Sequence, residues 1–133
     1  MTYLLDVNTL LALGFQQHEF HGRVASWVAR VQRPLLLATC SITELGFVRV
    51  LTQAPAYGFA LAQARTLLLR LKEANVPQFT FIADGHDISH LPAWVRTGKQ
   101  TTDGHLAQLA RSNAAVLATL DSKIPDAFLI PHK

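Results

Sequence analysis

The sequence predicts an α/β fold, a three-layer α/β/α sandwich with a mainly parallel central sheet. Short apolar segments alternate with segments of helical periodicity along the whole 133-residue chain. The clearest strand, Leu35–Ala38, is apolar at every position, as expected when both faces of a parallel sheet are covered. Half of the residues are hydrophobic and 16% are charged, which excludes intrinsic disorder and supplies a core.

In the first part of the chain, strand and helix signals follow each other without a linker. Gly14 and Pro77 end predicted helices, and the helix after Gly14 carries apolar side chains at the 3,4 spacing of one helical face. The expected elements are a strand Tyr3–Leu5, helices Asn8–Leu13 and Gln17–Val31, a strand Leu35–Ala38, and helices Ser41–Leu51 and Phe59–Asn75.

The second part of the chain continues the alternation. The expected elements are a strand Phe79–Ile82, a short helix Asp84–Leu91, a loop Trp94–Gln100 with Gly98 and Lys99 at its tip, a helix Thr102–Ser112, and strands Ala115–Ala118 and Phe128–Ile130. The length suits one domain, residues 1–133, without internal repeats.

Composition also indicates in which cellular compartment the protein is expected. No apolar run approaches the roughly 18 residues that a membrane-spanning helix needs, and the N-terminus lacks the basic start of a secretory signal. A single cysteine, Cys40, excludes an intramolecular disulfide. We therefore expect a cytoplasmic protein without membrane association. Twelve Lys and Arg against nine Asp and Glu give a net charge of +3, which weakly favours polyanionic partners.

Four acidic residues fall where strands end or where the following helices begin. Asp6 ends the first strand, and Asp121 follows the strand near the C-terminus. Glu44 and Asp103 lie in the first turns of their predicted helices. Because ligands collect at the carboxyl edge of a parallel sheet, these four side chains can meet there.

Such a cluster has a specific chemical meaning. Glu44 shares a helical face with Phe47 and Leu51, where a lone carboxylate is costly. Four converging carboxylates would repel each other unless a cation is bound. An all-oxygen ligand set suits Mg²⁺ or Mn²⁺, which activates water and offsets charge on phosphorus. The residues alone therefore predict metal-dependent cleavage of phosphodiesters.

Each acid also has a structural explanation. Ser41 and Glu44 fit a capping box, Asp103 suits the positive end of a helix dipole, and Asp121 suits a turn. Asp6 is the hardest to explain in this way, because it is a charge that ends an apolar strand. A receiver-like phosphoacceptor domain is a weaker alternative, since Asp6 has no acidic neighbour.

Four segments resemble the motifs of the PIN-domain nucleases. They are Leu4–Leu13, Thr39–Leu51, Thr102–Ala110 and Leu117–Asp121. Their order and spacing are similar to those of the VapC-type toxins, the ribonuclease halves of toxin–antitoxin pairs. One departure is Gly104, where the family more often has alanine; another is Lys123, whose charge comes one residue later than in the family.

The resemblance implies a function and a set of partners. The chain would be a metal-dependent endoribonuclease, the toxin of its pair, that cleaves tRNA, rRNA or mRNA; it would form a homodimer and bind a VapB-type antitoxin. The alternative is a non-catalytic RNA- or partner-binding domain of the same fold. By their motif positions, the catalytic residues that hold Mg²⁺, or Mn²⁺ in its place, would be Asp6, Glu44, Asp103 and Asp121. Asn8 and Thr119 would help to shape the site and to orient these ligands.

Other residues are candidates for contacts around this site. Trp94 is suited either to stacking on a base or to burial, and the long helix Phe59–Asn75 is a candidate partner contact. The sequence assigns no role to His18, His21 or Asp126, although the two histidines have the spacing of a weak zinc pair. The basic residues expected to contact RNA phosphates are Arg49, Arg96, Lys99 and Lys123.

Overall fold

A five-stranded parallel sheet forms the centre of the protein. The computed structural model describes residues 1–132, so Lys133, the last residue of the predicted domain, lies outside it. The strand order is β3-β2-β1-β4-β5, and all four strand pairs are parallel, as predicted. The strands are β1 (Thr2–Leu5), β2 (Leu36–Thr39), β3 (Gln78–Phe81), β4 (Val116–Thr119) and β5 (Phe128–Leu129).

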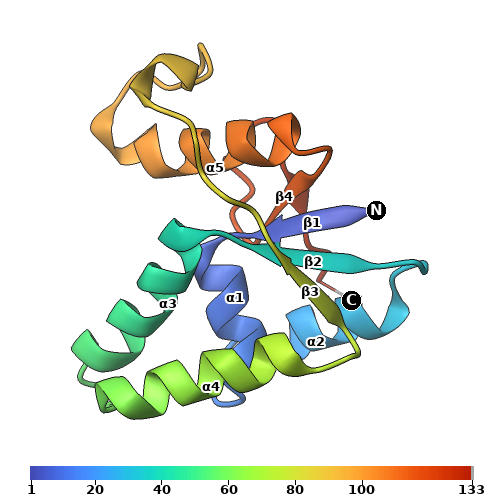
Figure 1. The fold of residues 1–133 in the computed structure, drawn as a ribbon, viewed down its shortest axis with the longest axis vertical. Helices are drawn as coiled ribbons and strands as arrows, with labels where there is room; N and C mark the ends of the chain where they lie inside the picture. Colours follow the sequence, from blue (N-terminus) through green and yellow to red (C-terminus); the bar gives the residue numbers. More distant parts are fainter. Residues whose placement is uncertain (133) are drawn as a thin grey trace.

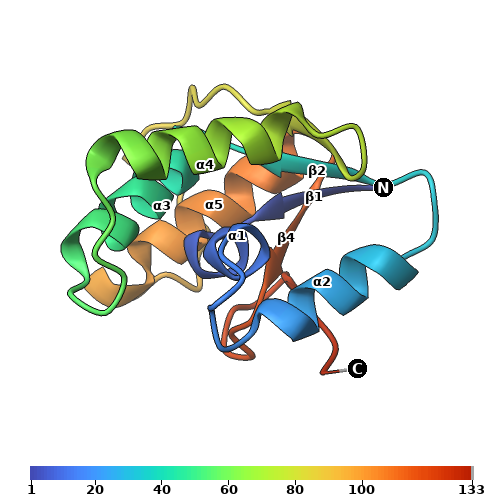
Figure 2. The same cartoon turned by 90° about the horizontal axis from the view of Figure 1, so that it is seen from below.

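Helices cover both faces of this sheet, which confirms the three-layer α/β/α prediction (Figure 1). Helix α5 lies on one face, and the other four helices lie on the opposite face. Figure 2 shows α1 between α2 and α4 on that face. The helices are α1 (Val7–Gly14), α2 (His21–Arg30), α3 (Ser41–Gln53), α4 (Leu61–Glu73) and α5 (Thr101–Ser112).

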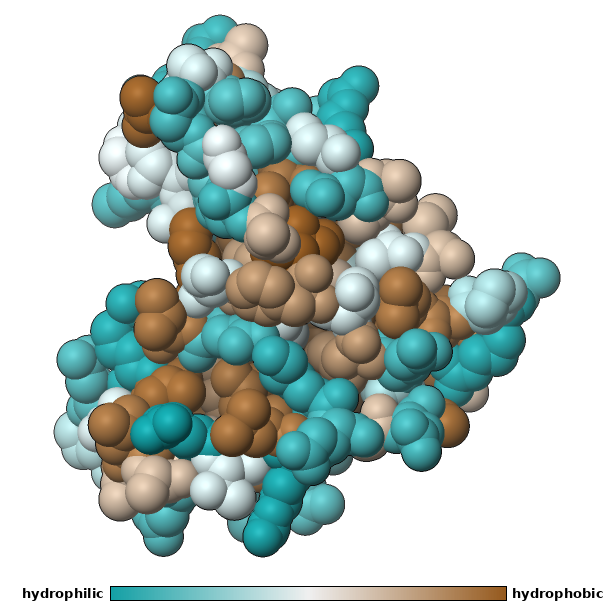
Figure 3. Space-filling model, in the orientation of Figure 1, coloured by the Kyte–Doolittle hydropathy of each residue, from teal (hydrophilic) through white to brown (hydrophobic). Residues whose placement is uncertain are grey.

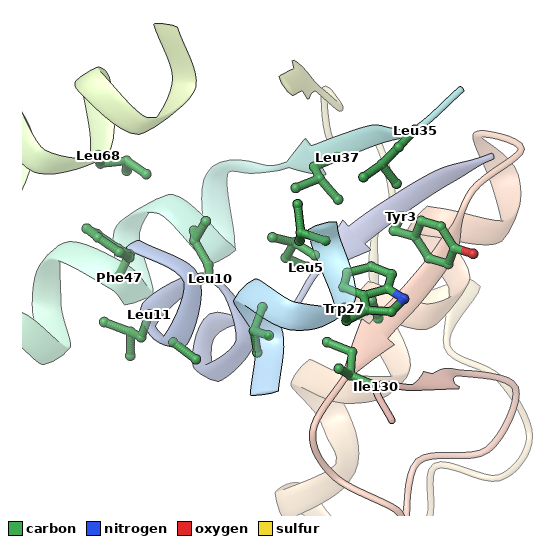
Figure 4. Packing of buried hydrophobic residues seen from close by; sticks show 14 of the residues in the cluster. Tyr3, Leu5, Leu10, Leu11, Trp27, Leu35, Leu37, Phe47, Leu68 and Ile130 are labelled. Carbon is green, nitrogen blue, oxygen red and sulfur yellow. The ribbon is translucent and has the colours of Figure 1, made fainter. Parts of the chain in front are cut away.

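The strands divide their side chains between two apolar clusters. Tyr3, Leu5 and Leu37 belong to the larger cluster, which they form with α1, α2, α3 and α4 (Figure 4). Trp27 of α2 packs edge-on against Tyr3, with ring centroids 5.0 Å apart. Leu4 faces the other way, into the smaller cluster with α5. This alternation explains why β1 is apolar at consecutive positions, since both of its faces are covered.

Some predicted element boundaries differ from the structure. The helix predicted from Gln17 begins only at His21, because residues 17–20 form a turn in which the His18 side chain accepts a hydrogen bond from the Phe20 amide. The predicted short helix at 84–91 is a single 3₁₀ turn, Ile88–His90. A second 3₁₀ turn, Gly98–Gln100, occupies the end of the predicted loop.

Gly104 has a packing explanation. A Cβ atom at this position of α5 would overlap the Val95 side chain and lie 3.4 Å from Cδ of Pro92. The loop before α5 therefore crosses the helix at a place where only glycine fits without a shift. The absence of a side chain at Gly104 thus allows the loop to pack closely on the helix that carries Asp103.

Within residues 1–132, we find no helix of the length and apolar character needed to cross a membrane.

Candidate active site

Three of the predicted acids line one cavity at the carboxyl edge of the sheet. Asp6 follows β1, Asp121 follows β4, and Asp103 comes from the first turn of α5. The cavity has a volume of about 390 Å³, and Asn8 and Thr119 also line it. The adjacency of β1 and β4 in the sheet is what brings together residues 115 positions apart.

Asp6 is buried, and both of its carboxylate oxygens are held. It is the N-cap of α1, where the Thr9 amide donates to Oδ1 at 2.9 Å. The Thr119 hydroxyl donates to Oδ2 at 2.6 Å. The N-terminus of α1, which favours negative charge, and the Thr119 hydroxyl therefore orient this carboxylate together.

The Thr119 hydroxyl links two of the acids. It donates to Asp6 and accepts a hydrogen bond of 3.0 Å from the Asp121 amide. Asp121 also has turn chemistry of its own, because its Oδ1 accepts from the Lys123 amide at 2.9 Å. The turn interpretation of Asp121 is therefore correct, and it coexists with a place at the cavity.

Asp103 experiences the charges of the other two acids. Burial raises the pKa of Asp103, and the negative charges of Asp6 and Asp121 raise this pKa further. A cation between these carboxylates would reverse that effect. The repulsion and the all-oxygen donor set together fit a hard divalent ion such as Mg²⁺ or Mn²⁺.

The carboxylates of the acid cavity do not form a ready-made set of metal ligands in this structure. Among residues 1–132, no group of three or more His, Cys, Asp or Glu side chains is placed so that it could hold a metal ion.

Glu44 does not line the cavity of the three aspartates, so the convergence expected for four acids is found for three. It lines a second cavity of about 450 Å³, between α3 and α4. There Oε2 accepts hydrogen bonds from the Thr39 hydroxyl at 2.6 Å and from Lys72 Nζ at 2.5 Å. The half-buried carboxylate is thus neutralised by a cation from α4, which lies 28 residues away in the chain.

The alternative explanation of Glu44 as the partner of Ser41 in a capping box does not hold in the structure. The N-cap of α3 is Cys40, and Thr43 closes the box, because the Cys40 amide donates to Thr43 Oγ1 at 3.0 Å. The pattern began one residue earlier than the sequence suggested. Glu44 was therefore free to bond elsewhere.

The sequence did not indicate that His18 forms a hydrogen bond with Asn8, a residue that lines the acid cavity. His18 is buried, and its Nε2 lies 3.1 Å from Oδ1 of Asn8. Burial lowers the pKa of His18 and so favours the neutral ring. His21 bonds instead to the carbonyl oxygen of Ala12 at 2.7 Å, so the two histidines have separate partners.

The predicted RNA-contacting residues lie outside the acid cavity. Trp94 is half-buried and packs against the smaller apolar cluster. Tyr57, which no sequence motif indicated, lines the acid cavity. The four basic residues expected to contact RNA are exposed and do not line that cavity: Arg49, Arg96, Lys99 and Lys123.

The fold and the acidic edge of the sheet place the chain in the class of PIN-domain proteins. Three relatives from Mycobacterium tuberculosis are similar over most of its length. Identity is 37% over 124 residues with Ribonuclease VapC38, covering 91% of this chain and 86% of the relative. It is 36% over 123 residues with Ribonuclease VapC29 (92% and 87%) and 35% over 131 residues with Ribonuclease VapC44 (93% and 89%).

A solved structure has the same fold. The crystal structure of VapBC2 from Rickettsia felis, bound to a DNA fragment from their promoter, matches with a TM-score of 0.55 at 13% identity, covering 97% of both chains. No family model matches the chain. On the strength of the sequence relatives, the chain belongs to the VapC family of ribonucleases.

Proposed function

We propose that this protein is a metal-dependent endoribonuclease and the toxin of a toxin–antitoxin pair, acting on RNA in the cytoplasm with Mg²⁺ or Mn²⁺. The observation that carries the proposal is the meeting of Asp6, Asp103 and Asp121 at one cavity. Membership of a family of ribonucleases supports it independently.

In this proposal, the three aspartates would hold the ion. The ion would polarise the scissile phosphate and activate a water molecule for attack. Asp6 meets the ion in an orientation already set by Thr9 and Thr119. Glu44 remains a proposed fourth ligand, because it follows β2, the other neighbour of β1. To take part, its carboxylate has to leave Lys72.

We also propose contacts for RNA and for a protein partner. The exposed basic residues Arg49, Arg96, Lys99 and Lys123 would bind RNA phosphates outside the cavity. Exposed apolar side chains gather over α3 and α4, around the cavity of Glu44 (Figure 3). This patch, which consists of Leu45, Leu61, Leu69 and Phe81, would contact a VapB-type antitoxin or the second subunit of a homodimer.

The test uses the purified protein and a labelled structured RNA. Cleavage should require Mg²⁺ or Mn²⁺, stop with EDTA, and be lost in Asp6→Asn. Asp126→Asn is the matched control, because Asp126 lies outside the acid cavity and asparagine tolerates its positive φ of 59°. Undiminished metal-dependent cleavage by Asp6→Asn would contradict the proposal.

Calorimetric measurement of Mn²⁺ binding distinguishes the metal-dependent nuclease from the non-catalytic alternative. The proposal expects Mn²⁺ to bind the wild-type protein and to bind Asp6→Asn much more weakly. RNA binding without Mn²⁺ binding or cleavage, in a protein with all of its acids intact, would favour a non-catalytic domain.

A further inference from the structure

We infer that His18 is a positioning residue that turns the amide nitrogen of Asn8, rather than its carbonyl oxygen, toward the acid cavity. In that orientation Asn8 is a hydrogen-bond donor for a non-bridging oxygen of the scissile phosphate. The catalytic part of this inference rests on the proposed nuclease function; the orientation itself does not.

The argument begins at the His18 ring. The Phe20 backbone amide, which can only donate, lies 3.1 Å from His18 Nδ1. Nδ1 must therefore be the unprotonated nitrogen of a neutral ring, and the proton must be on Nε2. The buried position of His18 agrees with a neutral ring, because burial opposes the charged form.

The tautomer then fixes Asn8. His18 Nε2 carries a hydrogen, so the Asn8 atom 3.1 Å away must be an acceptor, and that atom is the carbonyl oxygen Oδ1. The oxygen and the nitrogen of an asparagine amide are usually hard to tell apart. Here the Phe20 amide, which is connected to Asn8 by two hydrogen bonds through His18, decides between them. The amide nitrogen Nδ2 is therefore the Asn8 atom that faces away from His18. Asn8 is exposed and lines the acid cavity, so Nδ2 is available to a ligand there.

The chemistry of the cavity makes this orientation consequential. Asp6, Asp103 and Asp121 are acceptors when ionised, and they repel a phosphate. An N–H donor among them can bind a phosphate oxygen, whereas a carbonyl oxygen in the same place would serve as one more metal ligand. His18 therefore decides which of these two roles Asn8 has.

Two replacements of His18 separate this role from simple support of the turn at residues 17–20. The amide of glutamine reaches the place of Nε2, so His18→Gln can still donate to Asn8. The amide oxygen of asparagine lies near the place of Nδ1, so His18→Asn can still accept from Phe20 but does not reach Asn8. A purely structural role predicts that His18→Asn is the milder change, and our inference predicts the reverse.

The first test needs no RNA. Nitrogen-15 NMR of the metal-free wild-type protein should show His18 as the neutral Nε2–H tautomer. An Nδ1–H tautomer, or a ring protonated at neutral pH, would overturn the inference. This result is independent of whether the protein cleaves RNA, so it is decided separately from the proposed function.

The second test is kinetic, at saturating Mn²⁺ on a short RNA substrate. His18→Asn and Asn8→Ala should each lower kcat by about ten-fold or more, as removal of a supporting contact does. Mn²⁺ affinity should remain within roughly two-fold by calorimetry, since no ligand is lost. His18→Gln should recover most of the activity that His18→Asn loses.

The double variant His18→Asn/Asn8→Ala gives the decisive comparison. Because His18 acts through Asn8, the double variant should be no slower than Asn8→Ala alone. Multiplying effects, or a large loss of Mn²⁺ affinity in Asn8→Ala, would overturn the inference. If the wild-type protein cleaves no RNA while the tautomer is as expected, the nuclease proposal fails and the orientation of Asn8 stands.

Discussion

Replacing Thr119 with valine tests the hydroxyl that joins two acids of the site. Thr119 is 1% exposed, and valine keeps its shape while exchanging the hydroxyl for a methyl group. The change removes a 2.6 Å bond to the Asp6 carboxylate and a 3.0 Å bond from the Asp121 amide. A bond to a charged group contributes about 1.5–3 kcal/mol and a neutral bond near the surface contributes less, so we expect a loss of roughly 2–3 kcal/mol in unfolding free energy. For a domain of this size, that corresponds to a Tm lower by about 6–10 °C.

The assay is urea unfolding of the metal-free protein followed by circular dichroism, with Thr119→Ser as the matched control. Serine keeps both hydrogen bonds and loses only a buried methyl group, which costs about 1 kcal/mol. Thr119→Val should also lower RNA cleavage or Mn²⁺ affinity by about 10- to 100-fold, because Asp6 loses an orienting partner. If valine proves as stable and as active as serine, the reasoning about this hydroxyl is refuted.

Three further predictions concern other parts of the structure. A double-mutant cycle with Lys72→Met and Glu44→Gln should give a coupling of about 0.5–1 kcal/mol, since the pair is only half-buried, and a coupling of zero would contradict the ion pair. Gly104→Ala should destabilise the protein by about 1–3 kcal/mol through overpacking, whereas Gly22→Ala, a helical glycine with open space around it, should stabilise it by about 0.5–1 kcal/mol. Because burial lowers the pKa of His18 below the 6.5 of a free ring, the unfolded chain binds a proton more readily, so stability should fall as pH falls below about 6.5. Urea midpoints between pH 7.5 and 5 should show that decline in the wild-type protein and a smaller one in His18→Gln.

The fold was predictable because its signals are local and repeated. An apolar run such as Leu35–Ala38 indicates a covered parallel strand without knowledge of its neighbours, and the strand found there differs by one residue at each end. The positions of Asp6 and Asp121 at strand ends were equally informative, because all parallel strands end at one edge. Their meeting at one cavity followed from topology rather than from side-chain detail.

What the sequence could not supply is the partner of each polar side chain. Nothing near Glu44 in the sequence indicates that Lys72, on another helix, would take its carboxylate. Nothing in the spacing of His18 and Asn8 indicates a bond between a turn and the first turn of α1. These pairings depend on how helices pack, to within a fraction of a side-chain length, and periodicity carries no such information.

The three aspartates of the cavity are unequal in a way that bears on how the site works. Asp6 receives a backbone donor and a hydroxyl donor whether or not an ion is bound, so its orientation belongs to the fold. Asp103 receives no such donor from the described residues, and burial and the charges of Asp6 and Asp121 raise the pKa of Asp103. A cation bound between the carboxylates would lower the pKa of Asp103 again, because it would offset the two neighbouring negative charges. The end of β1 and the start of α1 therefore hold Asp6 in a fixed orientation, whereas Asp103 of α5 is the carboxylate that a bound cation would have to orient.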